Sequence, residues 1–198
     1  MAGIGIPSTH PTTLTGTDGV VRCGWVSETR PELRQYHDQE WGTPVHGEAA
    51  LFEALASTYF ENGLSWSVVF RKRAALRRAF ADFEPAVVAT MTERDVDRLV
   101  NDRTIIRNRA KLEATVHNAR LLTSTSLDDL AWRYQPRGRR PLRQWSDARS
   151  ESPESRALAM ALRQLGFRFV GAVVAHSFMQ AVGIDNGHFD GCFRAPSD

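Results

Sequence analysis

Residues 92–122 read TERDVDRLVNDRTIIRNRAKLEATVHNARLL and contain two helical patterns separated by a short break. Thr92 opens it with a capping-box pattern in which Asp95 occupies the position that reaches back to the cap, and apolar residues follow at helical spacing. A short break at 102–106 separates this first helix from a second one, which we expect over 107–122. The pattern therefore predicts two helices joined by a tight hairpin.

The start of the second helix is rich in positive charge, with Arg107, Arg109 and Lys111 within five positions. Amide groups at a helix N-terminus are free to donate, and the helix dipole favours an anion there. The hairpin is thus a candidate phosphate clamp, although most short helical hairpins bind nothing.

Helical periodicity also covers most of the remaining chain, over 48–60, 65–80, 152–166 and 169–182. No alternating strand pattern and no internal repeat stand out, so we expect an all-α fold. Residues 1–20 are rich in Thr, Gly and Pro and are expected to form a disordered tail. Residues 21–198 then form a single helical domain, which suits the chain length.

The composition excludes several classes of protein. Hydrophobic residues make up 42% of the chain, enough for a core, and no apolar run is long enough to span a membrane. The first 20 residues hold no Lys or Arg, and two cysteines make no disulfide framework, so we expect a cytoplasmic protein. The net charge is only +2, but the segments 71–78 and 133–143 each carry five positive charges and no acid. They suit a phosphate backbone, or equally a solvated Arg-rich surface.

The two cysteines lie at opposite ends of the domain, and each has a histidine nearby. Cys23 and His37 lie near the N-terminal end of the domain, and His188 and Cys192 lie near its C-terminal end with the spacing H-x3-C. Two thiolates and two imidazoles form a closed tetrahedral set for structural zinc. The alternative is two buried free thiols beside two incidental histidines.

Four aromatic residues lie in sequence around Cys23, His37 and the predicted helix at 48–60, namely Trp25, Tyr36, Trp41 and Trp66. Aromatic walls with polar edges suit a nucleobase flipped out of a duplex. A tryptophan-rich core explains the same residues.

Seven motifs resemble those of the 3-methyladenine DNA glycosylase I family and occur in order along the chain. They are RCGWVS at 22–27, YHDQEWG at 36–42, GLSW at 63–66, IIRNRAKLEA at 105–114, GFRFVG at 166–171, SFMQAVG at 177–183 and H-x3-C at 188–192. The resemblance implies a helix-hairpin-helix DNA glycosylase fold whose hairpin, around residues 102–109, grips a phosphate beside the lesion. It also implies a zinc snap that joins the N- and C-terminal segments through the four Cys and His residues above.

The resemblance further implies an enzyme of base-excision repair that acts as a monomer on double-stranded DNA. A methylated purine is flipped into a pocket and its N-glycosidic bond is hydrolysed. By position, Trp66 stacks on the base, Tyr36 hydrogen-bonds its edge, Trp25 lines the pocket, and Trp41 serves packing more than contact.

Four positions depart from the family pattern, namely Thr58, Tyr59, Glu61 and Thr104. The family carries a Glu five residues before Gly63, where this chain has Thr58, and a hydroxyl cannot form the charge-assisted hydrogen bond that a carboxylate forms with a cationic base. Tyr59 replaces a small residue and adds bulk near the pocket. Thr104 replaces a hairpin Gly, which is costly if that backbone needs a positive φ. We therefore expect altered pocket chemistry.

Glu61 is the nearest acid that could replace the missing one. On a helix it lies one turn on and about 60° round from Thr58. If the helix persists, we expect its side chain to point away from the pocket; if the helix unwinds before Gly63, it swings inward.

Three functions remain open. The first is a DNA glycosylase for an alkylated purine of the 3-methyladenine type. The second keeps the fold and the zinc but acts on a nucleoside or a small metabolite. The third is a non-catalytic module that binds damaged DNA. Release of a free base separates the first from the third, and salt-dependent DNA binding separates both from the second.

Overall fold

The computed structural model describes residues 10–138 and 140–196, and residues 1–9, 139 and 197–198 lie outside this description. The helices and strands are β1 (Thr13–Thr15), β2 (Val21–Cys23), α1 (Pro31–Gln39), α2 (Glu48–Phe60), α3 (Trp66–Ala79), α4 (Pro85–Val88), α5 (Glu93–Asn101), α6 (Arg109–Leu121), α7 (Leu127–Trp132), α8 (Pro153–Gln164) and α9 (Ala172–Ala181). Two 3-10 turns, Ala81–Phe83 and Trp145–Asp147, complete the described elements. No helix in the described ranges is long and apolar enough to cross a bilayer.

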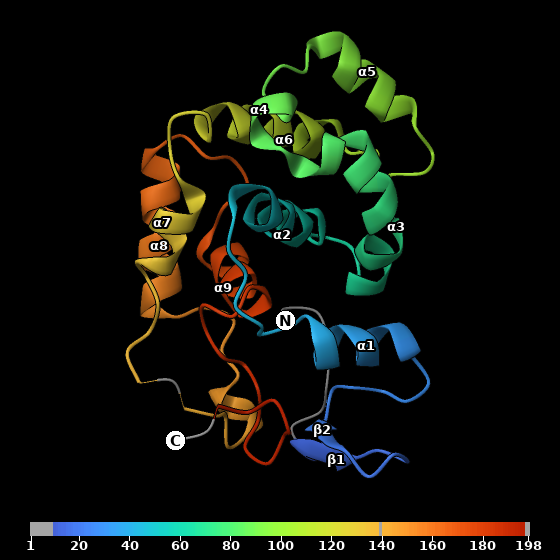
Figure 1. Ribbon diagram of the computed structural model, residues 1–198, viewed down its shortest axis with the longest axis vertical. Helices are drawn as coiled ribbons and strands as arrows, with labels where there is room; N and C mark the ends of the chain where they lie inside the picture. Colours follow the sequence, from blue (N-terminus) through green and yellow to red (C-terminus); the bar gives the residue numbers. More distant parts are fainter. Residues whose placement is uncertain (1–9, 139, 197–198) are drawn as a thin grey trace.

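Helix α2 lies at the centre of the helical part and packs against α3, α6, α7 and α9 (Figure 1). Leu51, Leu55 and Tyr59 lie on one face of α2 and are fully buried. Helix α9 is apolar on most sides, as expected for 169–182, and packs between α2 and α8. The predicted helices at 48–60, 65–80 and 152–166 are confirmed by α2, α3 and α8.

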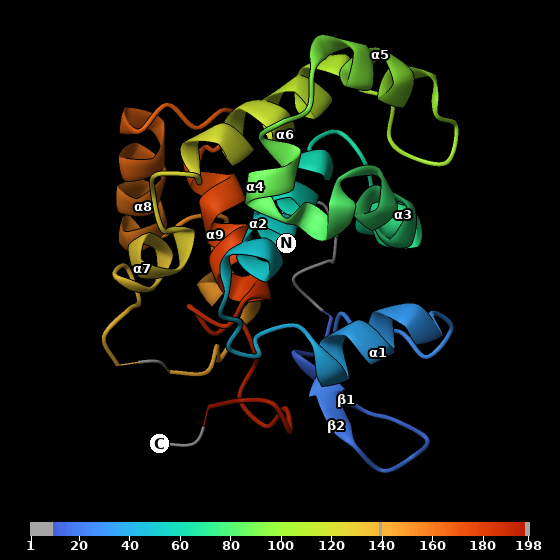
Figure 2. The ribbon, with the colours of Figure 1, turned by 45° about the horizontal axis from the view of Figure 1, so that its top comes forward.

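Helices α5 and α6 form the predicted hairpin, at the end of the molecule far from the strands (Figure 2). The Asp95 carboxylate accepts hydrogen bonds from the Thr92 amide at 2.9 Å and from its hydroxyl at 2.8 Å, so the start of α5 is confirmed. In the connection, the Thr104 amide and hydroxyl donate to Asp102 at 2.8 and 2.6 Å. Thr104 does not have a positive φ, so its replacement of glycine brings no left-handed strain.

The expected all-α fold needs a correction, because β1 and β2 form a small antiparallel sheet in which Thr13 pairs with Cys23. The strands are three residues long, too short to produce a visible alternation. The expected tail boundary at residue 20 moves as well, because the described residues 10–20 join this sheet and its neighbourhood. The Gly24 amide donates to Thr12 at 2.7 Å, and a Cβ on Gly24 would lie 2.0 Å from the Pro11 carbonyl. The first part of the expected tail, residues 1–9, lies outside the described residues.

The C-terminal segment returns to the N-terminal sheet. The Phe193 amide donates to the Val21 carbonyl at 2.9 Å, and Phe189 forms a parallel bridge with Leu142. A second, smaller core forms there around Cys23, Trp25 and Cys192, apart from the main helical core. The two ends of the domain are thus packed together.

The turn after α3 has an uncommon backbone. Ala81, Asp82 and Phe83 have φ values of 48°, 54° and 59°, in the left-handed region that favours glycine. Phe83 is buried against Phe52 and Phe80, with ring centroids 5.8 and 5.4 Å apart. The burial of Phe83 in the core holds this turn in place.

Candidate functional site

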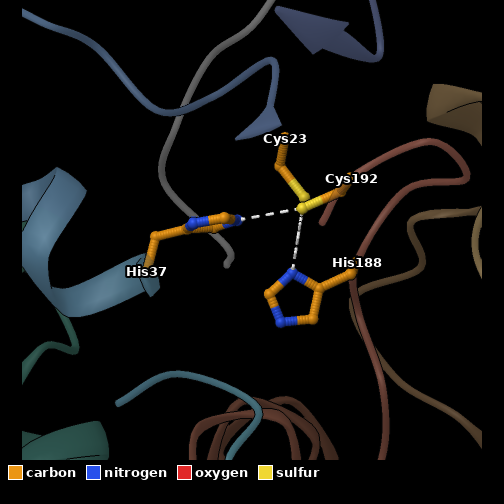
Figure 3. A group of neighbouring side chains, drawn as sticks. All are labelled: Cys23, His37, His188 and Cys192. Atoms are coloured by element: carbon orange, nitrogen blue, oxygen red, sulfur yellow. Dashed lines mark hydrogen bonds between the residues drawn. The ribbon is translucent and has the colours of Figure 1, made fainter. Parts of the chain in front are cut away.

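Four side chains from the two ends of the domain meet in one buried cluster (Figure 3). Cys23 comes from the end of β2, His37 from α1, and His188 and Cys192 from the C-terminal segment. Their ligand atoms all lie within 4.8 Å of one another. The structure therefore brings together the four residues that the sequence singled out, across more than 160 positions.

The spacing of these atoms fits a tetrahedral metal site. Ligands bound at about 2.0–2.3 Å from zinc are separated by about 3.3–3.8 Å in a tetrahedron. Here Cys192 Sγ lies 3.5 Å from His37 Nε2 and 3.7 Å from His188 Nδ1, and Cys23 Sγ lies 3.6 Å from His188 Nδ1. This buried Cys2His2 group could hold a metal ion with little rearrangement.

Neighbouring groups orient both imidazoles. His37 Nδ1 donates to Asp38 at 2.8 Å, and Arg22 holds Asp38 through two hydrogen bonds of 3.0 and 2.9 Å. His188 Nε2 donates to the Trp41 carbonyl at 3.4 Å. These bonds leave His37 Nε2 and His188 Nδ1 as free acceptors that face the sulfur atoms, as in metal sites whose ligands are fixed by outer hydrogen bonds.

Backbone atoms also pack closely against the side chains of the cluster. Gly42 has a φ of 75°, and a Cβ there would lie 2.8 Å from His188 Nε2. The Phe189 amide points at Cys23 Sγ from 3.4 Å. A hydrogen bond from Cys23 holds the pKa of the Cys192 thiol far below its usual value, while the same bond and burial raise the pKa of Cys23. Both shifts come from the close approach of the two sulfur atoms, which would bind a cation as thiolates.

A cavity of about 510 Å³ lies beside this cluster, between the two cores. Its walls come from α1, α2, α3 and α9. Trp25 links it to the cluster, because its ring lines the cavity and packs edge-on against both His37 and Trp41 with centroids 5.1 Å away. The indole N–H of Trp25 is buried and has no hydrogen-bond partner in the described part of the chain.

One face of α2 forms a wall of this cavity, and it is not the face that enters the core. The wall consists of residues at helical spacing, Ala50, Glu53, Ala54, Ser57, Thr58 and Glu61. Thr58 is buried and its hydroxyl donates to the Ala54 carbonyl at 2.8 Å. Tyr59 does not line the cavity, because it points into the main core, where its hydroxyl lies 2.7 Å from that of Thr115. The expected bulk of Tyr59 near the pocket is therefore wrong.

Glu61 lines the cavity although the helix persists through Phe60. The expectation that a continuing helix turns Glu61 away from the pocket is wrong. That expectation placed the pocket on the face of α2 that in the structure enters the core. Burial raises the pKa of the Glu61 carboxyl to about 7. Burial and then the charge of Glu61 raise the pKa of Tyr36, so its phenol stays protonated near the carboxyl.

The aromatic wall opposite α2 contains Trp66, Tyr36 and Phe70. The Trp66 and Phe70 rings stack at 4.5 Å and 23°, and Tyr36 lies 5.0 Å from Trp66. Trp41 also lines the cavity, and its edge meets His188 at 4.5 Å. Sequence reasoning did not single out Phe70, although its i, i+4 spacing from Trp66 places both on one face of α3.

Sequence reasoning also missed a charged network in the wall. Arg73 donates to Glu40 at 2.6 Å and to Glu53 at 2.9 Å, and Arg77 donates to Glu53 at 2.8 Å. Two arginines of the basic segment 71–78 are thus paired with acids. Their pairing depends on how α2, which carries Glu53, and the end of α1, next to Glu40, pack against α3, and local sequence patterns do not show this packing.

The hairpin residues divide into two groups. Arg107 and Thr104 are exposed, and Arg109 is exposed but paired with Asp97 and Glu113. Lys111 is buried, and its ammonium donates to the carbonyls of Phe60 at 3.0 Å and Asn62 at 2.6 Å. This corrects the expectation that Lys111 faces a phosphate, because its charge is used at the end of α2.

A second cavity of about 430 Å³ borders the same hairpin. Its lining includes Arg78, Arg98, Asp102 and Thr104. Arg78 belongs to the basic segment 71–78 and is exposed. Arg98 is paired with Asp95 at 3.1 Å, whereas Arg78 forms no ion pair with a described residue, so an exposed positive charge lies beside the loop of the hairpin.

Fold and site together define a helical protein with an aromatic cavity beside a Cys2His2 cluster. The family model of the methyladenine glycosylases matches residues 25–195. The chain belongs to this family, the 3-methyladenine DNA glycosylase I family.

Individual relatives agree over nearly the whole domain. The chain is 40% identical over 186 residues to DNA-3-methyladenine glycosylase 1 of Escherichia coli, which covers 89% of this chain and 98% of that protein. It is 36% identical over 180 residues to DNA-3-methyladenine glycosylase of Haemophilus influenzae, covering 86% and 96%. A crystal structure of a 3-methyladenine DNA glycosylase I superposes with a TM-score of 0.83 at 38% identity, covering 88% of this chain and 100% of that one. The Staphylococcus aureus enzyme, whose structure addresses 3-methyladenine recognition, gives a TM-score of 0.78 at 35% identity, covering 85% and 93%.

Proposed function

We propose that this protein is a DNA glycosylase that hydrolyses the N-glycosidic bond of a 3-methyladenine-type base in duplex DNA. The observation that carries the proposal is the aromatic cavity itself. The cavity is lined by Trp66, Tyr36 and Trp25, and the chain belongs to the 3-methyladenine DNA glycosylase I family.

The cavity provides what a flipped base requires. Trp66, already stacked on Phe70, offers a flat surface for the base. The raised pKa of Tyr36 keeps its phenol protonated, so it can donate to a ring nitrogen. The unpartnered indole N–H of Trp25 is a second buried donor. An unpaired buried donor is unfavourable, so a ligand that accepts from it gains affinity.

The chemistry needs little acid catalysis. Adenine methylated at its third ring position is cationic in DNA, so the bond to the sugar breaks with its electron pair moving onto the base, which leaves neutral. Water adds to the anomeric carbon and releases its proton to solvent. The chain binds and orients the base and holds it in the desolvated cavity.

The pocket chemistry is altered at Thr58. Its hydroxyl proton is committed to Ala54, so toward the cavity it offers a neutral acceptor only. Trp41 serves packing between the cavity and the Cys2His2 cluster in this proposal.

For the duplex, we propose that the α5–α6 unit acts as a helix-hairpin-helix. Arg107 and the exposed loop at Thr104 would contact the phosphate backbone, with Arg109 beside them. Arg78, which lines the second cavity and is exposed, would extend this contact with phosphate.

For the metal, we propose structural zinc held by Cys23, His37, His188 and Cys192. Four protein ligands leave no position for water or substrate, so the ion would stabilise the junction of the two chain ends. It would take no part in the reaction.

The test is release of free base from alkylated duplex DNA, measured by chromatography. The parent protein should release 3-methyladenine, and Trp66→Ala should abolish release while its melting temperature stays close to that of the parent. DNA binding without release would favour a binding module. Absence of both would favour a nucleoside or small-metabolite substrate.

A further inference from the structure

One acid in the base cavity has no ionic partner among the residues that the structure describes. Glu61 lines the cavity from the end of α2, and no described Lys, Arg or His side chain forms an ion pair with its carboxyl. The two other acids of the lining, Glu40 and Glu53, are paired with Arg73 and Arg77. Glu61 is therefore the acid of the lining whose charge is not neutralised by the described residues.

The backbone on both sides of Glu61 is fixed. Its amide donates to Ser57 at 3.1 Å, and its carbonyl accepts from the Leu64 amide at 2.8 Å. Lys111 binds the carbonyls of the residues immediately before and after it, Phe60 and Asn62. Such clamping fixes the direction in which the Glu61 side chain leaves the helix, so its place in the cavity is built into the fold.

The neighbours of the carboxyl are aromatic or neutral. Tyr36 is close enough for the charge of Glu61 to act on its phenol, and Trp66 lies beside Tyr36. Thr58, one turn earlier on the same face, contributes a hydroxyl. Arg30 also lines the cavity, but it is exposed and therefore screened by water. A carboxylate in such surroundings is poorly solvated and is stabilised by a cation placed against it.

We propose that Glu61 is the residue that selects a cationic base, by accepting a charge-assisted hydrogen bond from the exocyclic amine of the alkylated purine. The proposal rests on the proposed glycosylase function. A neutral base in the same position gains no comparable attraction, so Glu61 separates alkylated purines from ordinary ones by charge. Tyr36 and the stacked Trp66 hold either base by shape.

The test compares Glu61→Gln with the parent on two duplexes, one containing methylated, cationic adenine and one containing unmethylated, neutral adenine at the same position, which keeps the exocyclic amine. Hydrogen bonds to charged groups are worth about 1.5–3 kcal/mol, which corresponds to about 10- to 100-fold. We expect kcat/KM for release of 3-methyladenine to fall by that factor, while binding of the unmethylated duplex changes less than about twofold. The Glu84→Gln control removes an exposed acid outside the cavity and should leave both values unchanged.

A second variant moves the charge within the cavity. Because Thr58 lies on the same face of α2, Thr58→Glu in the Glu61→Gln background should restore most of the lost rate. Unchanged release by Glu61→Gln, or an equal loss on both duplexes, would overturn the proposal.

If the protein is not a glycosylase, selection by charge is tested through binding instead of base release. If the parent releases no base, binding of the methylated and unmethylated duplexes is compared by fluorescence anisotropy. A preference of the parent for the methylated duplex that disappears in Glu61→Gln supports the selection by charge. The same preference in both proteins, or no preference in the parent, overturns it.

Discussion

Lys111→Met removes the ammonium that closes the end of α2 and keeps an apolar chain of similar length. The Phe60 carbonyl then loses its partner in a buried position, and the Asn62 carbonyl loses one in a partly buried position. A buried polar group without a partner costs about 1–3 kcal/mol, and part of this is offset because the ammonium no longer has to be desolvated. Burial lowers the pKa of Lys111, in agreement with that cost.

The expected net loss is about 3 kcal/mol of unfolding free energy, or a melting temperature lower by about 6–12 °C for a domain of this size. Chemical denaturation measures the first value and a thermal melt the second. Because Lys111 faces inward, the salt dependence of binding to undamaged duplex should not change. Arg107→Met serves as the comparison, since its exposed guanidinium is expected to contact phosphate and its loss should reduce the salt slope by about 0.9.

The opposite pattern would refute this assignment. A stability change below about 0.5 kcal/mol, together with a reduced salt slope in Lys111→Met, would mean that the side chain faces DNA and that the end of α2 is held in another way.

Three further predictions concern the cluster, the pocket and the turn after α3. Chelation of the metal-loaded protein, or Cys192→Ser, should lower the free energy of unfolding by about 4 kcal/mol when the metal concentration is about a thousandfold above its Kd. Thermal melting measures this loss, and an unchanged melting temperature would exclude the structural metal. Because burial raises the pKa of Glu61 to about 7 from 4.5, its carboxyl becomes neutral below that range, so affinity for the methylated duplex should fall as pH drops through 7. The pH dependence of affinity should be absent in Glu61→Gln. Between pH 4.5 and 7 the folded protein holds a proton on Glu61 that the unfolded chain has lost, so the free energy of unfolding should fall as the pH rises through this range. Asp82→Gly should stabilise the fold by about 1 kcal/mol, since Asp82 has a φ of 54°, and denaturation showing a loss instead would place the strain elsewhere.

The helices and the Cys2His2 cluster could be found from sequence because their signals are local or chemically rare. Helical periodicity and caps such as Thr92 with Asp95 depend on residues within a few positions. Cysteine and histidine pairs stand out by residue type, even though the chain between Cys23 and Cys192 must fold to join them. The short strands carried no such local signal, and the spacing of Phe70 from Trp66 showed a shared helix face but not that this face meets a cavity.

Periodicity alone determined that α2 has two faces, with Leu51, Leu55 and Tyr59 on one and Thr58 and Glu61 near the other. It could not say which face meets the core and which meets the cavity, because that depends on where α1, α3 and α9 pack. The same holds for Lys111, whose position at a helix start suggests an anion until α2 places two carbonyls against it. Composition and spacing thus determined the elements and the metal-ligand residues, whereas the packing of distant helices decided which charges face the base, because side-chain partners come from segments far apart in the chain.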